Sequence, residues 1–92
     1  MKIVKSIELP ADSNYKLTKI SSLNKNPVMI AKNHSVIGIL HWNLIKLGRN
    51  VIVVGNGFSN IIYTTEVTKI RVLKRKIVFH TLNSIYELKE VK

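Results

Sequence analysis

Apolar residues recur along this chain in short runs rather than in long stretches. Segments of about 5–10 residues rich in Ile, Val, Thr, Tyr and Phe alternate with clusters of Gly, Pro, Asn, Asp and Ser. Such clusters occupy residues 10–14, 24–27 and 48–50. β-branched and aromatic segments bounded by turn residues are typical of strands. The pattern therefore predicts a mainly β protein built from many short strands.

One hairpin is predicted over residues 51–63. Asn56-Gly57 can adopt positive φ at both central positions, which a type I′ turn requires. The preceding arm, Val51 to Val54, is continuously apolar and β-branched. A run of this kind favours a central strand that is buried on both faces.

A second hairpin is predicted from about Val67 to Thr81, with Lys74-Arg75 at its tip. Period-two alternation then separates a core face from a basic face. The core face pairs Val72 with Ile77 and Ile70 with Phe79. The other face carries Lys69, Arg71, Val78 and His80.

Three other segments have strand character. Lys2 to Leu9 and Tyr15 to Leu23 each read as one strand, and a last strand follows a bend at Asn83-Ser84. In that last strand Tyr86 and Leu88 are expected to point into the core.

The segment from Ser35 to Leu47 fits two structures. Ser35 can cap a helix and Gly48 can end one, but Gly38 and several β-branched residues oppose a helix. We expect a strand from Ser35 to Leu40 and a short helical turn from Trp42 to Leu47.

These elements predict one domain over residues 1–92. The expected fold is a small, partly open antiparallel barrel of about six or seven strands, of the SH3-like or OB-like kind. The chain has no cysteine, so it forms no disulfide framework, and its N-terminal residues do not read as a signal peptide. No stretch is long and apolar enough for a membrane helix. A cytoplasmic protein without a membrane association is expected.

The charge balance is strongly basic. Fifteen Lys and Arg oppose five Asp and Glu, for a net charge of +10. No acid lies between Asp12 and Glu66 or between Glu66 and Glu87. An A/T-rich genome explains many lysines, but it would raise glutamate as well. The excess therefore indicates a polyanionic partner, of which nucleic acid is the most abundant.

The second hairpin concentrates this charge. Three consecutive cations at its tip repel one another and gain from an anionic partner. The predicted nucleic-acid-binding residues are Arg49, Lys69, Arg71, Lys74, Arg75, Lys76 and His80. Replacing Lys74, Arg75 and Lys76 by alanine is expected to lower the salt dependence of duplex binding by up to about three units. Alternatively, these cations only keep an edge hairpin from pairing with other chains.

Two aromatic residues are candidate platforms for stacked bases. Trp42 lies close to Lys46 and Arg49 in the sequence, and Phe58 follows a tight turn. A core position is the alternative for both side chains.

Catalytic and metal chemistry have little support in the sequence. The three histidines lack metal-ligand spacing, no glycine-rich phosphate loop occurs, and no cofactor is expected. The five acids are scattered, so an enzyme is not predicted. One nuclease scheme remains open, with Glu66 or Glu87 as base, His80 as acid and Arg71 on the phosphate.

The leading hypothesis is therefore a small protein that binds DNA or RNA through phosphates with low sequence specificity. The alternative is a viral or mobile-element accessory or inhibitor protein that docks on an acidic host protein or a nucleoprotein. A pocket for a small charged molecule such as a nucleotide is a third hypothesis. Edge strands also allow a homo-oligomer.

Overall fold

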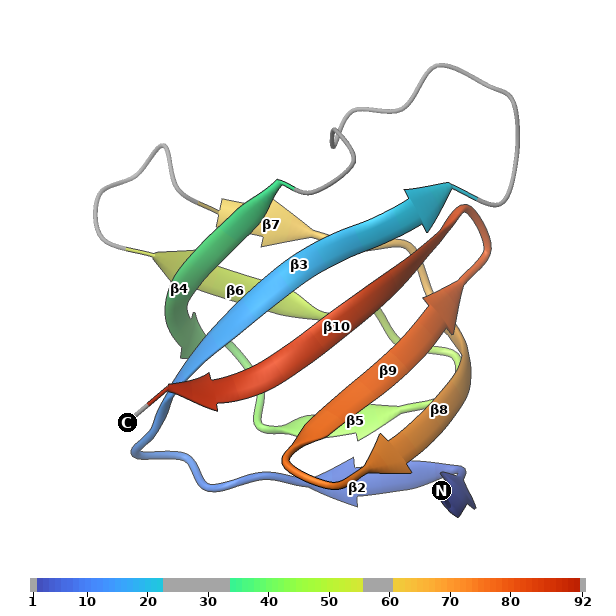
Figure 1. The fold of residues 1–92 in the computed structure, drawn as a ribbon, viewed down its shortest axis with the longest axis horizontal. Helices are drawn as coiled ribbons and strands as arrows, with labels where there is room; N and C mark the ends of the chain where they lie inside the picture. The colour runs from blue at the N-terminus through green and yellow to red at the C-terminus, as the bar shows by residue number, and fades with distance from the viewer. Residues whose placement is uncertain (1, 23–33, 56–60, 92) are drawn as a thin grey trace.

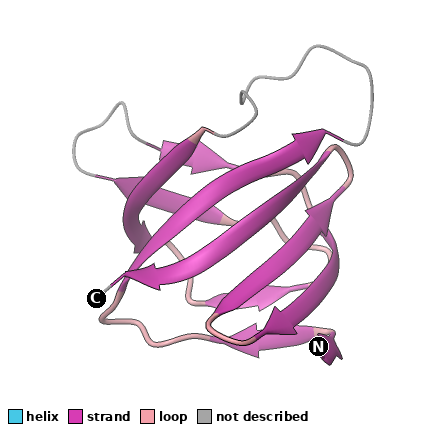
Figure 2. Cartoon of the chain, in the orientation of Figure 1, coloured by secondary structure: helices cyan, strands magenta, loops and turns pink. Residues whose placement is uncertain are grey.

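The structure, a computed structural model, describes residues 2–22, 34–55 and 61–91 (Figure 1). These residues form strands joined by loops, and no helix occurs among them (Figure 2). In the described ranges, no helix is therefore long and apolar enough to cross a membrane. The strands are β1 (Lys2–Val4), β2 (Ser6–Glu8), β3 (Asn14–Ser22), β4 (Ser35–Leu40), β5 (Leu44–Lys46), β6 (Ile52–Gly55), β7 (Ile61–Tyr63), β8 (Val67–Leu73), β9 (Lys76–Thr81) and β10 (Ser84–Val91).

Eight strands form one sheet in the order β1-β8-β9-β10-β3-β4-β6-β7, and β2 pairs with β5 in a separate ribbon. Every pairing is antiparallel. The large sheet curls, so that β3, β10 and β9 lie in front of β6 and β5 (Figure 1). The mainly β, antiparallel prediction is confirmed. The sheet is not closed into a barrel, and an SH3-like or OB-like type stays a prediction.

The hydrophobic core fills the inside of this curled sheet. Alternating residues from β3 to β10 point inward, as period two requires. The buried side chains include Tyr15, Leu17, Val36, Ile45, Val53, Ile62, Ile70, Phe79, Tyr86 and Leu88. The rings of Phe79 and Tyr86 stack with centroids 5.3 Å apart, which joins β9 to β10. Tyr86 and Leu88 therefore occupy the core positions that the sequence predicted.

The predicted pairing of the second hairpin is confirmed. Val72 lies opposite Ile77, and Ile70 lies opposite Phe79, with Lys74-Arg75 between β8 and β9. This register follows directly from alternation around a two-residue connection.

The first hairpin is confirmed in its arms, because β6 pairs with β7 and Val53 lies opposite Ile62. Its predicted Asn56-Gly57 turn and Phe58 lie outside the described residues. β6 is flanked by β4 and β7. The prediction that the arm from Val51 to Val54 is buried on both faces is wrong, because Val51 and Val53 are buried whereas Ile52 and Val54 are half-buried.

Three other sequence predictions need correction. The helical turn over residues 42–47 is wrong, because Leu44–Lys46 is a strand that pairs with β2. The single strand over residues 2–9 is wrong too, because a bend at Lys5 divides it between the two sheets. Six or seven strands become ten in the described residues. The extra strands are only three residues long, so their side-chain pattern is too short to read.

A glycine sets the close approach of β4 to β6. A Cβ added at Gly38 would lie 2.0 Å from the carbonyl oxygen of Val54, nearer than any real contact. Gly38 lies opposite Gly55 in the sheet. Only glycine therefore lets the two backbones meet at this point.

Candidate nucleic-acid interface

The outward side chains of β8 and β9 are those that alternation predicted. Arg71 lies opposite Val78, and Lys69 lies opposite His80. Lys69 is exposed, while Arg71 and His80 are half-buried. Val78 is only 6% exposed and lies outside the main core cluster, so the polar side chains around it cover an apolar floor.

The tip of the hairpin holds Lys74 and Arg75, both exposed. Arg75 has a φ of 70°, in the left-handed region that usually favours glycine or asparagine. Among the described residues, no carboxylate lies within 4.0 Å of Lys69, Arg71, Lys74 or Arg75, since the ion pairs found there involve Lys76 and Lys89. Four cations of the predicted set thus have no acidic partner in this part of the chain.

Lys76 differs from the other predicted cations, because it is already paired. Its Nζ lies 3.2 Å from Oε2 of Glu87 on β10, and Lys89 Nζ lies 3.3 Å from Oε1 of the same residue. Burial is the largest single influence on the pKa of Glu87 and raises it, but the hydrogen bonds from Lys76 and Lys89 outweigh it. The pKa of Glu87 is therefore lowered, and its negative charge is held against the two lysines.

This surface also includes two cations that were not among the predicted nucleic-acid-binding residues. Lys89 lies opposite Lys16 on β3, and both are exposed. The alternating pattern could have predicted their outward direction. Lys16 lies between the buried residues Tyr15 and Leu17, and Lys89 follows the buried residue Leu88. The outward cations of β3, β8, β9 and β10, together with those of the β8–β9 turn, are called the basic face. They are Lys16, Lys69, Arg71, Lys74, Arg75, Lys76 and Lys89.

Two atoms near the centre of the basic face lack hydrogen bonds. Arg71 Nε and His80 Nε2 are shielded from solvent and have no partner among the described residues. Burial is the main cause that lowers the pKa of His80, and the charges of Arg71 and Lys69 lower it further. His80 is therefore held neutral near pH 7, and the face keeps capacity for more positive charge.

Arg49 and Trp42 form a separate pair. The guanidinium of Arg49 lies 3.9 Å from the centre of the Trp42 ring, a cation–π contact. The backbone carbonyl of Arg49 accepts a hydrogen bond from Val67 N, which ties this loop to the start of β8. Trp42 is 41% exposed, so the alternative prediction that it is a core residue is wrong.

Lys19 is buried and therefore does not belong to the basic face. It points to the core side of β3, after Tyr15 and Leu17, and is only 1% exposed.

The β8–β9 hairpin does not project from the sheet as an isolated two-stranded ribbon, because β1 flanks β8 and β10 flanks β9 (Figure 1). Its basic side chains therefore form part of a continuous sheet surface.

Metal-binding side chains do not gather in the described ranges, where no group of three His, Cys, Asp or Glu residues could hold an ion. The chain matches no known family model, and comparisons with curated proteins and with solved structures find no match.

Proposed function

We propose that this protein binds nucleic acid through the phosphate groups, with the basic face as its interface. One observation carries the proposal. Seven cationic side chains gather on β3, β8, β9, β10 and the hairpin tip, and among the residues that the structure describes only Glu87 forms ion pairs with them. Such a surface attracts polyanions and gains free energy when phosphates displace condensed counterions.

The geometry favours backbone contacts over base reading. The basic residues lie on a sheet surface, and the β8–β9 hairpin is flanked on both sides, so it is not free to enter a groove as a two-stranded ribbon. Phosphate contacts position a protein without reading sequence. We therefore expect low sequence specificity.

The test is a pair of variants with equal loss of charge. The first, Lys69→Ala with Arg71→Ala, removes two cations from the basic face. The matched control, Lys5→Ala with Lys46→Ala, removes two exposed cations from the bend after β1 and from β5, outside the basic face. Fluorescence anisotropy titrations with duplex and single-stranded oligonucleotides between about 50 and 200 mM salt give the slope of log K against log salt.

The first variant should lower the duplex slope by about 1.8, because each phosphate contact contributes about 0.9. The control variant should leave the slope within error of the wild type. Equal losses in both variants would mean that binding follows net charge alone, and the basic face would not be the interface.

A second candidate function rests on a different surface. Ile37 and Ile39 on β4 and Tyr63 on β7 are 52%, 54% and 61% exposed, respectively. Contiguous exposed apolar residues are typical of protein-binding surfaces. This surface supports the alternative, a viral or mobile-element accessory protein that docks on a host protein. A stoichiometric complex lost on Ile37→Ser with Ile39→Ser, and kept by the Lys69/Arg71 variant, would establish it.

A further inference from the structure

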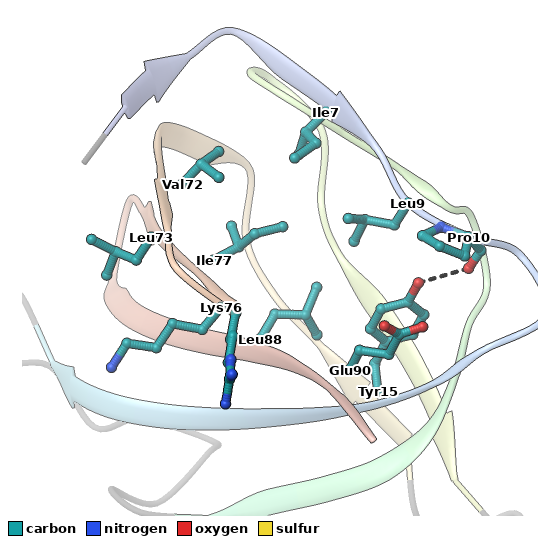
Figure 3. A pocket seen from close by; sticks show the side chains of 11 residues that line it. Ile7, Leu9, Pro10, Tyr15, Val72, Leu73, Lys76, Ile77, Leu88 and Glu90 are labelled. Atoms are coloured by element: carbon teal, nitrogen blue, oxygen red, sulfur yellow. Dashed lines mark hydrogen bonds between the residues drawn. The ribbon is translucent and has the colours of Figure 1, made fainter. Parts of the chain in front are cut away.

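A cavity of about 230 Å³ opens at one end of the curled sheet (Figure 3). Its walls come from segments far apart in the sequence: β2 and the residues after it, the start of β3, the β8–β9 turn, and β10. Its apolar lining consists of Ile7, Leu9, Pro10, Val72, Leu73, Ile77 and Leu88, together with the ring of Tyr15. It exceeds a cavity of about 150 Å³, which suffices for benzene.

The polar groups beside the cavity are already engaged. Tyr15 Oη donates a hydrogen bond of 2.7 Å to the Pro10 carbonyl (Figure 3). The carboxylate of Glu90 accepts a hydrogen bond from Ser13 Oγ. A nucleobase or sugar would bury polar edges against Ile, Leu and Val without replacing their bonds to water. An aliphatic chain has no such groups, so the lining selects for it.

The cavity also has three charged lining residues, of which Arg75 and Glu90 are exposed and Lys76 is half-buried. Arg75 belongs to the β8–β9 turn, Lys76 begins β9, and Glu90 belongs to β10. Lys76 is paired with Glu87, whereas Arg75 has no carboxylate within 4.0 Å among the described residues. The free guanidinium of Arg75 complements an anionic headgroup, and guanidinium groups bind carboxylates well.

From this combination we infer that the cavity binds a free fatty carboxylate, with its aliphatic chain against Leu9, Val72 and Ile77 and its headgroup at Arg75. The inference goes beyond the proposed nucleic-acid binding and rests on a different set of side chains, with only Arg75 and Lys76 common to both.

The experiment is a chain-length series measured by titration calorimetry on the wild-type protein, with hexanoate, octanoate and decanoate. Affinity should rise by about fourfold for each added methylene until the cavity is full, because each methylene leaves water. Decanol, which has the same chain without the charge, should bind more weakly than decanoate. Affinity that does not change with chain length, or no saturable binding, would overturn the inference.

Two variants locate the site. Val72→Phe places a larger side chain on the cavity wall and should reduce decanoate affinity by at least tenfold. Arg75→Gln leaves the walls intact and should weaken decanoate while leaving decanol unchanged. Decanoate should shift the methyl NMR signals of Leu9, Val72 and Ile77, whereas shifts at Ile37 and Ile39 instead would place the ligand on the exposed apolar surface and contradict the inference.

Two controls separate the outcomes. Phosphatidylcholine vesicles free of fatty acid, which carry no net charge to attract the basic face, should not bind, and binding to these vesicles without binding to free decanoate would replace the inferred ligand by a membrane lipid. Oligonucleotide titration of Val72→Phe should retain the wild-type salt slope. Failure of fatty carboxylate binding with an intact slope would leave the proposed function standing.

Discussion

Two regions of the same sheet present opposite surfaces to solvent. The strands β8, β9, β10 and β3 carry the basic face, whereas β4, β6 and β7 contain no charged residue in their described ranges. In both regions alternate side chains point to the core, where Ile70 and Val53 are equally buried. The outward set includes seven Lys and Arg side chains in one region, and Ile37, Ile39 and Tyr63 in the other.

The difference teaches that the fold constrains only one face of each strand. Core packing fixes the inward residues, and the outward residues can vary without loss of the core. The difference in charge and hydropathy between these two outward surfaces is therefore not required by packing of the core. We interpret the basic region as the polyanion surface and the uncharged region as a surface for apolar contact.

The largest expected effect on stability comes from Gly38→Ala, a substitution in the uncharged region. The new Cβ would collide with the Val54 carbonyl and force β4 away from β6. We expect the free energy of unfolding to fall by about 3 kcal/mol, measured by urea denaturation. Gly48→Ala is the control, because a Cβ there meets no atom within 4 Å and pays only for its φ of 84°. A smaller loss of about 1 kcal/mol is expected. Similar losses in both variants would show that the close approach at Gly38 is unimportant.

A second prediction concerns the charge balance of the basic face. Glu87→Gln frees Lys76 and Lys89 from their ion pairs. Nucleic-acid affinity should rise about tenfold at low salt, because two more cations can neutralise phosphates. Oligonucleotide titrations measure the change. Unaltered affinity would place both lysines outside the interface. Thermal unfolding should show only a modest loss of stability, because the pairs are partly exposed.

A third prediction uses the lowered pKa of His80. The charged groups that lower this pKa are Arg71 and Lys69 on β8, and on the other neighbouring strand, β10, Glu87 lies opposite Val78. As the pH falls from the ordinary histidine value of 6.5 through the lower folded pKa, His80 gains a proton. A bound phosphate favours that charged form, so affinity should rise several-fold over this window.

Stability should change in the opposite direction over the same window. The unfolded chain takes up the proton more readily, so the contribution of His80 is complete above pH 6.5 and declines below it. The affinity prediction is tested by comparing the oligonucleotide affinity of the wild type with that of His80→Gln across this pH range. An equally steep pH dependence in His80→Gln would assign the effect to another group.

The smallest effect is expected from Ile37→Ser with Ile39→Ser. Both side chains are more than half exposed, so the free energy of unfolding should change by only about 0.5 kcal/mol. The salt slope of oligonucleotide binding should not change, because no charge is altered. A lower slope in this variant would break the division between the two regions and join them in one interface.

Alternation along the chain was sufficient to predict much of the fold. It identified β8, β9 and their register, and the inward positions of Tyr86 and Leu88. The strand Ser35–Leu40 was predicted from its β-branched residues and Gly38, which oppose a helix. Alternation failed for β1, β2 and β5, because three residues are too few to display a period. Their positions depend on partners far away in the sequence, as Ile7 shows by pairing with Ile45.

The candidate site divides in the same way. The sequence determined that Lys69 and Arg71 share an outward face, since that property is local to one strand. Tertiary structure alone placed Glu87 against Lys76 and brought Lys16 beside Lys89. It also formed the cavity between β2 and the β8–β9 turn. Side-chain direction follows from the two-residue repeat of a single strand, but neighbours across a sheet are fixed by the order in which distant strands pair.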